Sequence, residues 1–304
     1  MRLSSHYMFQ RSIESMSNAM NSGNKIYTSL AAGRTLLKPS DDPAGASQAI
    51  TLQSALSTLD QYDTARSYAQ DALGQQDTVL NSISSLLSKN LMEKIVAAES
   101  DSYSAADRKA LATELEGIRN NLRDLANSKN SNGRYIFSGY ATATKPFNED
   151  GTWNGADKAM SQTVADGTTI TVGHTGKELF MTGSDNDIFA ALNNAINVLN
   201  DDQLSNSERH DKLEGTNAVI LKGIDNLGKI QAEVGTCLQQ LDTLASNAAE
   251  QRIQIQTRLE QTVGADPDTW TRLVGQSKMA DFAMTASMAV FQSMQKMSIF
   301  SMLQ

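Results

Sequence analysis

The sequence contains few cysteines, prolines and aromatic residues, which cross-link a chain, interrupt its helices or add large rigid side chains. Its 304 residues include one cysteine, four prolines and two tryptophans, and aromatic residues make up 6%. The lone cysteine, Cys237, cannot form a disulfide within the chain, and beside Leu238 on a predicted helix we expect it to be buried. The scarcity of proline and the 13 methionines suit long helices, because unbranched side chains lose little freedom there.

Excess positive charge is also absent. The formal net charge is −8 and the pI is near 5.0, which argues against a nucleic-acid partner, since phosphate backbones attract basic surfaces. The N-terminus lacks a basic start followed by an apolar run, so it does not resemble a cleaved signal peptide. No stretch approaches the roughly 18 apolar residues of a membrane span; residues 279–303 come closest, but charged and amide residues interrupt them. We expect no membrane partner and, if the protein is exported, a route without a cleaved signal.

Catalytic and metal-binding constellations are missing as well. His6, His174 and His210 lie far apart in the sequence and lack ligand spacing. Asp41 and Asp42 could form an acid pair or a metal site, but with Pro43 next, a helix cap is the favoured interpretation. We therefore expect no enzyme activity and no cofactor or metal.

Apolar residues instead recur at alternating steps of three and four, the pattern of a helical seam in a coiled coil or bundle. Shorter seams are Ala49-Leu52-Leu56-Leu59, Leu73-Gln76-Leu80-Ile83-Leu87 and Leu111-Leu115-Ile118-Leu122-Leu125. The longest is Ile220, Ile224, Leu227, Gln231, Val234, Leu238, Leu241, Ala245, Ala248, Arg252, Ile255, Leu259 and Thr262. This helix would be about 65 Å long, although Gly223, Gly228 and Gly235 each weaken it or mark close contacts.

Helix caps and turns mark where these helices begin and where the helical pattern stops. Asp42-Pro43 and Asp266-Pro267 both predict helix starts, with an aspartate cap and proline at the first helical position, and Ser104–Asp107 is a third candidate start. Between residues 146 and 183 the chain is rich in Gly and Thr. There, Asp166-Gly167 lies between β-forming segments and predicts a hairpin.

The sequence therefore predicts a mainly α fold. Its antiparallel coiled-coil or helical bundle is built from both chain ends, because a thin apolar stripe must pack against another, and a small β-rich insertion lies in the middle. The C-terminal segment carries its own stripe, which invites a partner. The residues expected to make assembly contacts are Ala283, Val290, Phe291, Met294, Met297, Ile299, Phe300 and Leu303.

Several motifs resemble those of a known family. These are Leu30-Ala31-Ala32-Gly33-Arg34, Pro39-Ser40-Asp41-Asp42-Pro43-Ala44, and Met297-Ser298-Ile299-Phe300-Ser301-Met302-Leu303. They resemble the N-terminal signature and the C-terminal helix of the flagellins and hook-associated proteins of bacteria. The run Asn132-Gly133-Arg134-Tyr135-Ile136-Phe137-Ser138-Gly139-Tyr140, with Pro146-Phe147 after it, resembles a hallmark of the family's junction members, which lie between hook and filament.

The resemblance implies discontinuous domains. They would be a terminal helical domain of residues 1–40 and 270–304, a helical bundle of residues 41–140 and 187–265, and a β-rich insertion of residues 141–186. It also implies export without a cleaved signal, an extracellular place in the flagellum, and assembly at the hook tip. The implied partners are hook-associated protein 1, flagellin, further copies of the chain in a ring, and a cytoplasmic export chaperone.

Two alternatives remain at this point. A flagellin-like filament subunit would share the terminal motifs, and the Tyr135–Gly139 run argues against it. A cytoplasmic coiled-coil adaptor would explain the heptads, but neither the central β insertion nor the apolar C-terminal helix.

Overall fold

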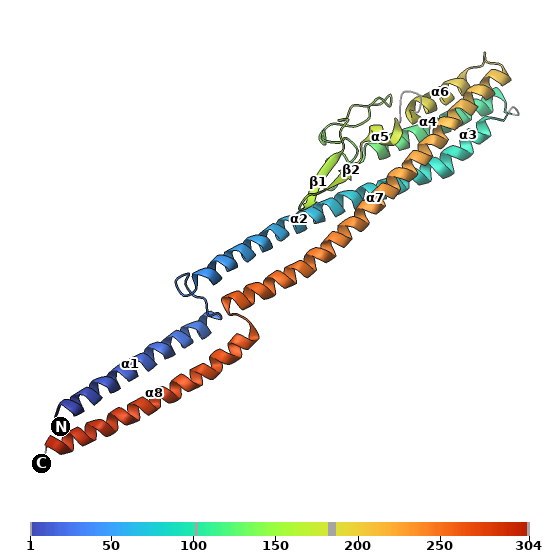
Figure 1. Ribbon diagram of the computed structural model, residues 1–304. Coiled ribbons are helices and arrows are strands. Elements are labelled where there is room, and N and C mark those ends of the chain that lie inside the picture. Colours follow the sequence, from blue (N-terminus) through green and yellow to red (C-terminus); the bar gives the residue numbers. More distant parts are fainter. Residues whose placement is uncertain (1, 101–102, 182–186, 303–304) are drawn as a thin grey trace. The chain divides into compact units, whose positions relative to one another are not determined.

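The computed structural model describes residues 2–100, 103–181 and 187–302 and shows the predicted mainly helical fold (Figure 1). The helices are α1 (Arg2–Ala32), α2 (Pro43–Ser85), a π-helix η1 (Leu86–Leu91), α3 (Met92–Ala98), α4 (Ala105–Ala126), α5 (Gly176–Phe180), α6 (Ile188–Asn200), α7 (Asn206–Val263) and α8 (Pro267–Met302). Strands β1 (Met160–Ala165) and β2 (Thr168–Gly173) form an antiparallel hairpin.

The chain divides into two compact units. One unit comprises Met1–Leu59 and Ala249–Gln304, and the other comprises Asp60–Ala248. The boundaries between the two units fall within α2 and α7, so each of these helices contributes residues to both units. The domain boundaries expected from the sequence follow the breaks between helices instead, and that three-domain division stays a prediction.

In the unit of Asp60–Ala248, α2 and α7 pack antiparallel along the predicted seams. The amide of Gln70 donates to Asp242 at 2.8 Å and the amide of Gln231 donates to Asn81 at 3.0 Å, so residue numbers rise on one helix as they fall on the other. Leu241, at the centre of the predicted seam, is completely buried. The seam prediction for the long helix is confirmed, and the helix begins earlier than the seam, at Asn206.

The π-helix has a clear cause in the sequence. Ile83, Leu87, Leu91 and Ile95 are all completely buried, and they follow one another at steps of four. Because an α-helix has 3.6 residues per turn, repeated steps of four turn the apolar stripe away from the core. The wider π-helical turn at Leu86–Leu91 realigns that stripe, since its hydrogen bonds span five residues instead of four.

Of the three glycines Gly223, Gly228 and Gly235 within α7, only Gly223 marks a close contact between helices. A Cβ at this position would collide with Ile188 of α6, whereas Gly228 and Gly235 have open space beside them. The glycine therefore lets α6 approach α7, as one of the two sequence-based interpretations suggests.

The β insertion shares its core with the surrounding helices. The hairpin turn is confirmed at Asp166-Gly167, with Gly167 at φ +66°. Phe147, Val164 and Phe180 are buried in the same apolar cluster as residues of α4, α6 and α7. Rings of Phe147 and Phe180 meet edge to face at 5.5 Å.

Two buried polar side chains of α2 hold this insertion. Arg66, which also pairs with Asp63, donates to the carbonyl of Val164 at 2.9 Å, and the side-chain oxygen of Gln76 accepts from the backbone of His174 at 3.4 Å. Both side chains are buried, and Gln76 occupies a position of the predicted seam, where the other residues are apolar. These two hydrogen bonds connect α2 to the insertion, and losing either would leave a further buried polar group unpaired, which is costly.

We predict an acid-sensitive contribution to stability from His174. Burial lowers the pKa of its imidazole, and the opposing influences of Glu178 on α5 and Glu233 on α7 are smaller. The unfolded chain, with an ordinary histidine pKa of about 6.5, therefore takes up the proton first. Stability should fall as the pH drops below about 6.5 towards the folded-state pKa.

The measurement is urea denaturation at pH 7.5 and pH 5.0. His174→Gln should lose part of the difference between the two pH values. His210→Gln removes an imidazole that is exposed in the folded chain. This variant should keep the difference in stability between the two pH values. An unchanged difference in His174→Gln would contradict the prediction.

Candidate assembly surface on the terminal helices

Helices α1 and α8 lie side by side and antiparallel (Figure 1). The seam between them consists of Phe9, Ser12, Met16, Ala19, Gly23 and Ile26 on α1, and Leu273, Ser277, Ala280, Met284, Ser287, Phe291 and Met294 on α8. Each is less exposed than the residues beside it, and the steps alternate between three and four. The rings of Phe9 and Phe291 are 5.3 Å apart. Six of these 13 positions carry Gly, Ala or Ser, and such small residues allow the helices to approach closely.

The residues predicted to make assembly contacts divide between two faces of α8. Phe291 and Met294 lie in the seam and are partly buried against α1. Ala283 and Val290 are exposed, Val290 to 55%. The side chains of Met297, Ile299 and Phe300, and the whole of Leu303, lie outside the described residues.

Two further apolar surfaces remain uncovered in this unit. The first, the outer face, lies on α8 and consists of Met279, Phe282, Ala286 and Val290. Met279 is 71% exposed and Phe282 is 72% exposed. The second, the flank strip, consists of Ile13, Met20 and Tyr27 on α1 and Val274 and Met288 on α8, all 41% to 52% exposed.

Sequence reasoning missed the α1 part of the flank strip. Ile13, Met20 and Tyr27 are spaced seven residues apart, which could have revealed them. Seven residues are close to two helical turns, so the three side chains share one side of α1. Patterns of this kind are hard to tell from a seam until the neighbouring helix is known.

The family motif around Gly33 and Arg34 ends α1. The backbone N–H of Arg34 donates to the carbonyl of Ser29 and that of Gly33 donates to Leu30, with Gly33 at φ +68°. These two bonds form a Schellman motif, in which glycine adopts the left-handed conformation that other residues avoid. Gly264 ends α7 in the same way, with φ +65°.

The next helices then begin with the same device. Asp42 accepts from the N–H groups of Ala44 and Gly45 at 3.1 and 3.0 Å, and Asp266 accepts from Thr269 at 3.0 Å. Pro43 and Pro267 occupy the first helical positions, where a missing N–H has no cost. Asp42 therefore serves as a helix cap in this structure.

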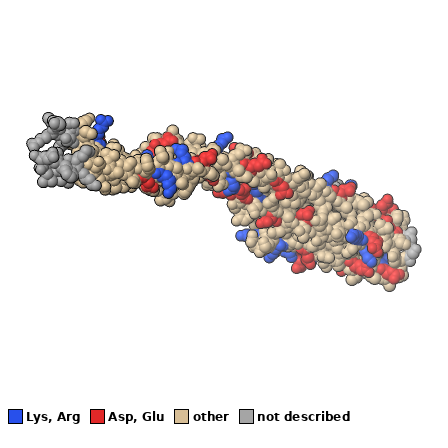
Figure 2. Space-filling model, turned by 90° about the horizontal axis from the view of Figure 1, so that it is seen from below, with Lys and Arg blue, Asp and Glu red and all other residues tan. Residues whose placement is uncertain are grey.

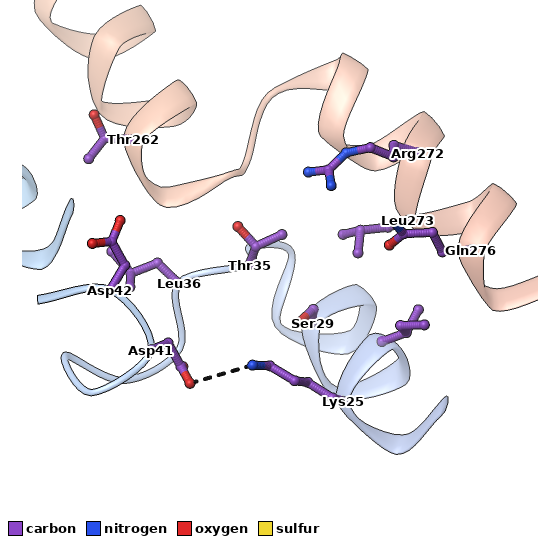
Figure 3. Close-up of a pocket in the computed structure, with 11 residues that line it drawn as sticks. Lys25, Ser29, Thr35, Leu36, Asp41, Asp42, Thr262, Arg272, Leu273 and Gln276 are labelled. Carbon is purple, nitrogen blue, oxygen red and sulfur yellow. Dashed lines mark ion pairs between the residues drawn. The ribbon is translucent and has the colours of Figure 1, made fainter. Parts of the chain in front are cut away.

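The two helix breaks are joined to each other. The N–H groups of Thr35 and Leu36 both donate to the carbonyl of Val263, at 3.0 and 3.1 Å. A hollow of about 330 Å³ lies beside these breaks, and Asp41, Asp42 and Arg272 are among the residues that line it (Figure 3). Lys25 lies 3.8 Å from Asp41 across its edge. The motif from Gly33 to Pro43 thus ends α1 and begins α2, and backbone hydrogen bonds join this helix break to the break between α7 and α8.

We predict that Gly264→Ala destabilises these two joined helix breaks. A residue other than glycine at this φ costs about 1–3 kcal/mol, and the new Cβ would also collide with Thr35. The melting temperature followed by circular dichroism should fall. Gly228→Ala is the matched control, because Gly228 lies in open space within α7 and alanine should stabilise the helix by about 1 kcal/mol. A melting temperature that moves the same way in both variants would refute this account.

The Tyr135–Gly139 run lies in the other unit and is largely internal. Phe137 and Ser138 are completely buried, and the carbonyl of Phe137 accepts from the N–H of Gly176 at 2.8 Å. Gly139 has φ +60°, and a Cβ there would press on the carbonyls of Ala156 and Lys158. Ile136 donates to Ser128 and Tyr135 donates to Thr142. This run joins the end of α4 to the β insertion and offers little contact surface.

The described residues contain no group of three or more His, Cys, Asp or Glu side chains placed to hold a metal. None of the helices in that part of the chain combines the length and hydropathy needed to cross a membrane. On the face shown in Figure 2, basic and acidic residues are interspersed, without a basic patch. The uncovered apolar faces of α1 and α8 are therefore the main candidate for function.

Comparison with known proteins identifies the class of protein. Residues 3–142 match the bacterial flagellin N-terminal helical region. The Flagellar hook-associated protein 3 of Salmonella typhimurium is 32% identical over 319 residues, covering 99% of each chain.

Two crystal structures from Legionella pneumophila share the fold. Flagellar hook associated protein-3 has a TM-score of 0.63 and 19% identity, covering 71% of this chain and 99% of its own. The flagellar junction protein FlgL has a TM-score of 0.57 and 20% identity, covering 72% of this chain and 100% of its own.

The chain belongs to the family of flagellar hook-associated protein 3. It is a structural protein of the flagellum.

Proposed function

We propose that this protein is the structural adaptor between the hook and the filament of the bacterial flagellum. Its partners would be hook-associated protein 1 on the hook side, flagellin on the filament side, and further copies of itself in a ring. Before assembly, a cytoplasmic export chaperone would bind it. Export would proceed without a cleaved signal, to an extracellular site.

The observation that carries the proposal is the uncovered apolar surface of the terminal helices. Phe282 and Met279 are more than 70% exposed, and burying such a side chain contributes about 1.5–3 kcal/mol. A single copy leaves this stabilisation unused, because the seam between α1 and α8 occupies other faces of the helices. Large exposed apolar patches mark interaction sites, and the similarity to flagellar hook-associated protein 3 over nearly the whole chain supports partners among the components of the flagellum.

Immunogold labelling of purified hook–filament complexes tests the proposal. Gold particles should gather at the point where hook and filament meet. Label distributed along the filament would instead support a flagellin-like filament subunit. Complexes free of label, with the protein confined to the cytoplasm, would support a coiled-coil adaptor and exclude the junction role.

A further inference from the structure

The chain contains two Asn-Gly dipeptides, Asn132-Gly133 and Asn154-Gly155, and both asparagines are exposed. This dipeptide can react without an enzyme. The backbone nitrogen of the glycine loses its proton to solvent base and attacks the side-chain carbonyl carbon of the asparagine. A new C–N bond closes a five-membered succinimide ring, and the side-chain amide nitrogen leaves as ammonia. Glycine permits the attack because it has no Cβ to hinder the approach.

The structure distinguishes the two sites by the state of the attacking nitrogen. The N–H of Gly133 donates to the carbonyl of Asn130 at 2.9 Å, and that bond must break before the nitrogen can lose its proton and turn towards Asn132. Within the described part of the chain, the N–H of Gly155 has no hydrogen-bond acceptor. The side-chain amide of Asn154 makes one long hydrogen bond, to the carbonyl of Lys145 at 3.4 Å. The reaction at residue 154 therefore has less to overcome.

Packing against Trp153 explains why a glycine occupies position 155. A Cβ on Gly155 would lie 2.5 Å from the indole ring of Trp153, which is closer than real side chains approach. The indole is held by its edge-to-face contact with Phe147, at 5.2 Å between ring centroids, and by the hydrogen bond from its Nε1–H to Asp157 at 3.1 Å. A bulkier residue at position 155, which would slow the reaction, would therefore disturb this packing.

We propose that Asn154 is a site of spontaneous deamidation in the folded protein, and that the fold protects Asn132 from the same reaction. Water opens the succinimide at either of its two carbonyl carbons. One opening gives aspartate, and the other gives isoaspartate, in which the main chain runs through the former side chain and is longer by one carbon. Either product adds a negative charge. Since the ammonia is lost to solvent, the change is a one-way record of the age of each copy.

The modified residue lies beside a buried part of the β insertion. Phe147 and Trp153 form an isolated β-bridge, and the N–H of Asn154 donates to the carbonyl of Pro146 at 2.7 Å. Phe147 is completely buried. The added charge, and in isoaspartate the extra main-chain carbon, therefore arise next to the pairing that closes this loop. The modification does not depend on the proposed function.

Timed incubation of the purified full-length protein, followed by mass spectrometry of its tryptic peptides, tests the proposal. Trypsin cleaves after Lys129, Arg134 and Lys158, so the two asparagines fall in separate peptides. In the folded protein, aspartate and isoaspartate should accumulate several-fold faster at residue 154 than at residue 132. The rate should be higher at pH 8.5 than at pH 6.5, because the reaction begins with loss of the amide proton. Asn154→Gln should abolish the change at this position, because glutamine would have to close a larger ring.

A parallel incubation in guanidinium chloride is the control. Unfolding breaks the hydrogen bond between Gly133 and Asn130, so both asparagines should then react at comparable rates. Equal rates in the folded protein, or a faster reaction at Asn132, would overturn the proposal. It would also fail if Asn154 stayed unmodified in the folded protein over a period in which the unfolded sample reacts.

Discussion

A strain that lacks the gene for this chain should build complete hooks, carry no filaments and release flagellin into the medium as soluble monomer. This follows from the proposed junction role, because the hook is assembled earlier and flagellin would lack a surface on which to order its own terminal helices. Ordering a residue costs about 1–2 kcal/mol of backbone entropy, and a lone helix with one apolar stripe cannot offset that cost in water. Electron microscopy of the cells and immunoblots of the medium measure both outcomes.

Complementation separates the assembly surface from the rest of the chain. The full-length gene should restore filaments. A gene without residues 279–304 should not, because it lacks the outer face of α8 and part of the seam. A variant with Gln240→Asp, on an exposed position of α7, should restore filaments fully. Normal filaments in the clean null strain would refute the junction assignment.

Leu241→Asp should cause a large loss of stability. The side chain of Leu241 is completely buried in the seam of α7, close to the hydrogen bond between Gln70 and Asp242. The substitution removes apolar contacts worth about 2–5 kcal/mol and places an unpaired carboxylate in their stead. We expect the free energy of unfolding to fall by about 4 kcal/mol or more.

Gln240→Asp is the matched control for this prediction. It introduces the same carboxylate one residue earlier, on the exposed side of the helix, where substitutions change stability by about 0.5 kcal/mol or less. Urea denaturation of the two full-length variants gives the comparison. Equal midpoints would mean that the seam of α7 is assigned to the wrong face.

The sequence predicts those parts of the structure that depend on local geometry. Asp42-Pro43 and Asp266-Pro267 specify helix starts because cap and proline act within one turn. Asp166-Gly167 specifies a hairpin turn because glycine accepts positive φ. The seam from Ile220 to Thr262 is readable because a long helix repeats the same step many times.

The polar anchors of the β insertion could not be predicted. Gln76 occupies a seam position, where sequence alone indicates only a polar interruption. Its partner is the backbone of His174, and the partner of Arg66 is the carbonyl of Val164. Both partners lie 98 residues away in the chain, and such pairings depend on how the chain folds back.

The family motifs show the same limit. The Tyr135–Gly139 run is distinctive in sequence, yet the structure places Phe137 and Ser138 in the interior, where they connect α4 to the insertion. A distinctive run can be preserved by packing as well as by binding, and only burial separates the two.

By itself, the sequence determined that this protein is a mainly helical chain with a central hairpin and with apolar stripes at both ends. Only the tertiary structure decided which stripe of α8 faces α1 and which remains uncovered. The reason is physical: helical periodicity places Phe282 and Phe291 on different sides of one helix, but the approach of α1 determines which side loses contact with water. Phe291 packs against Phe9, and Phe282 remains 72% exposed.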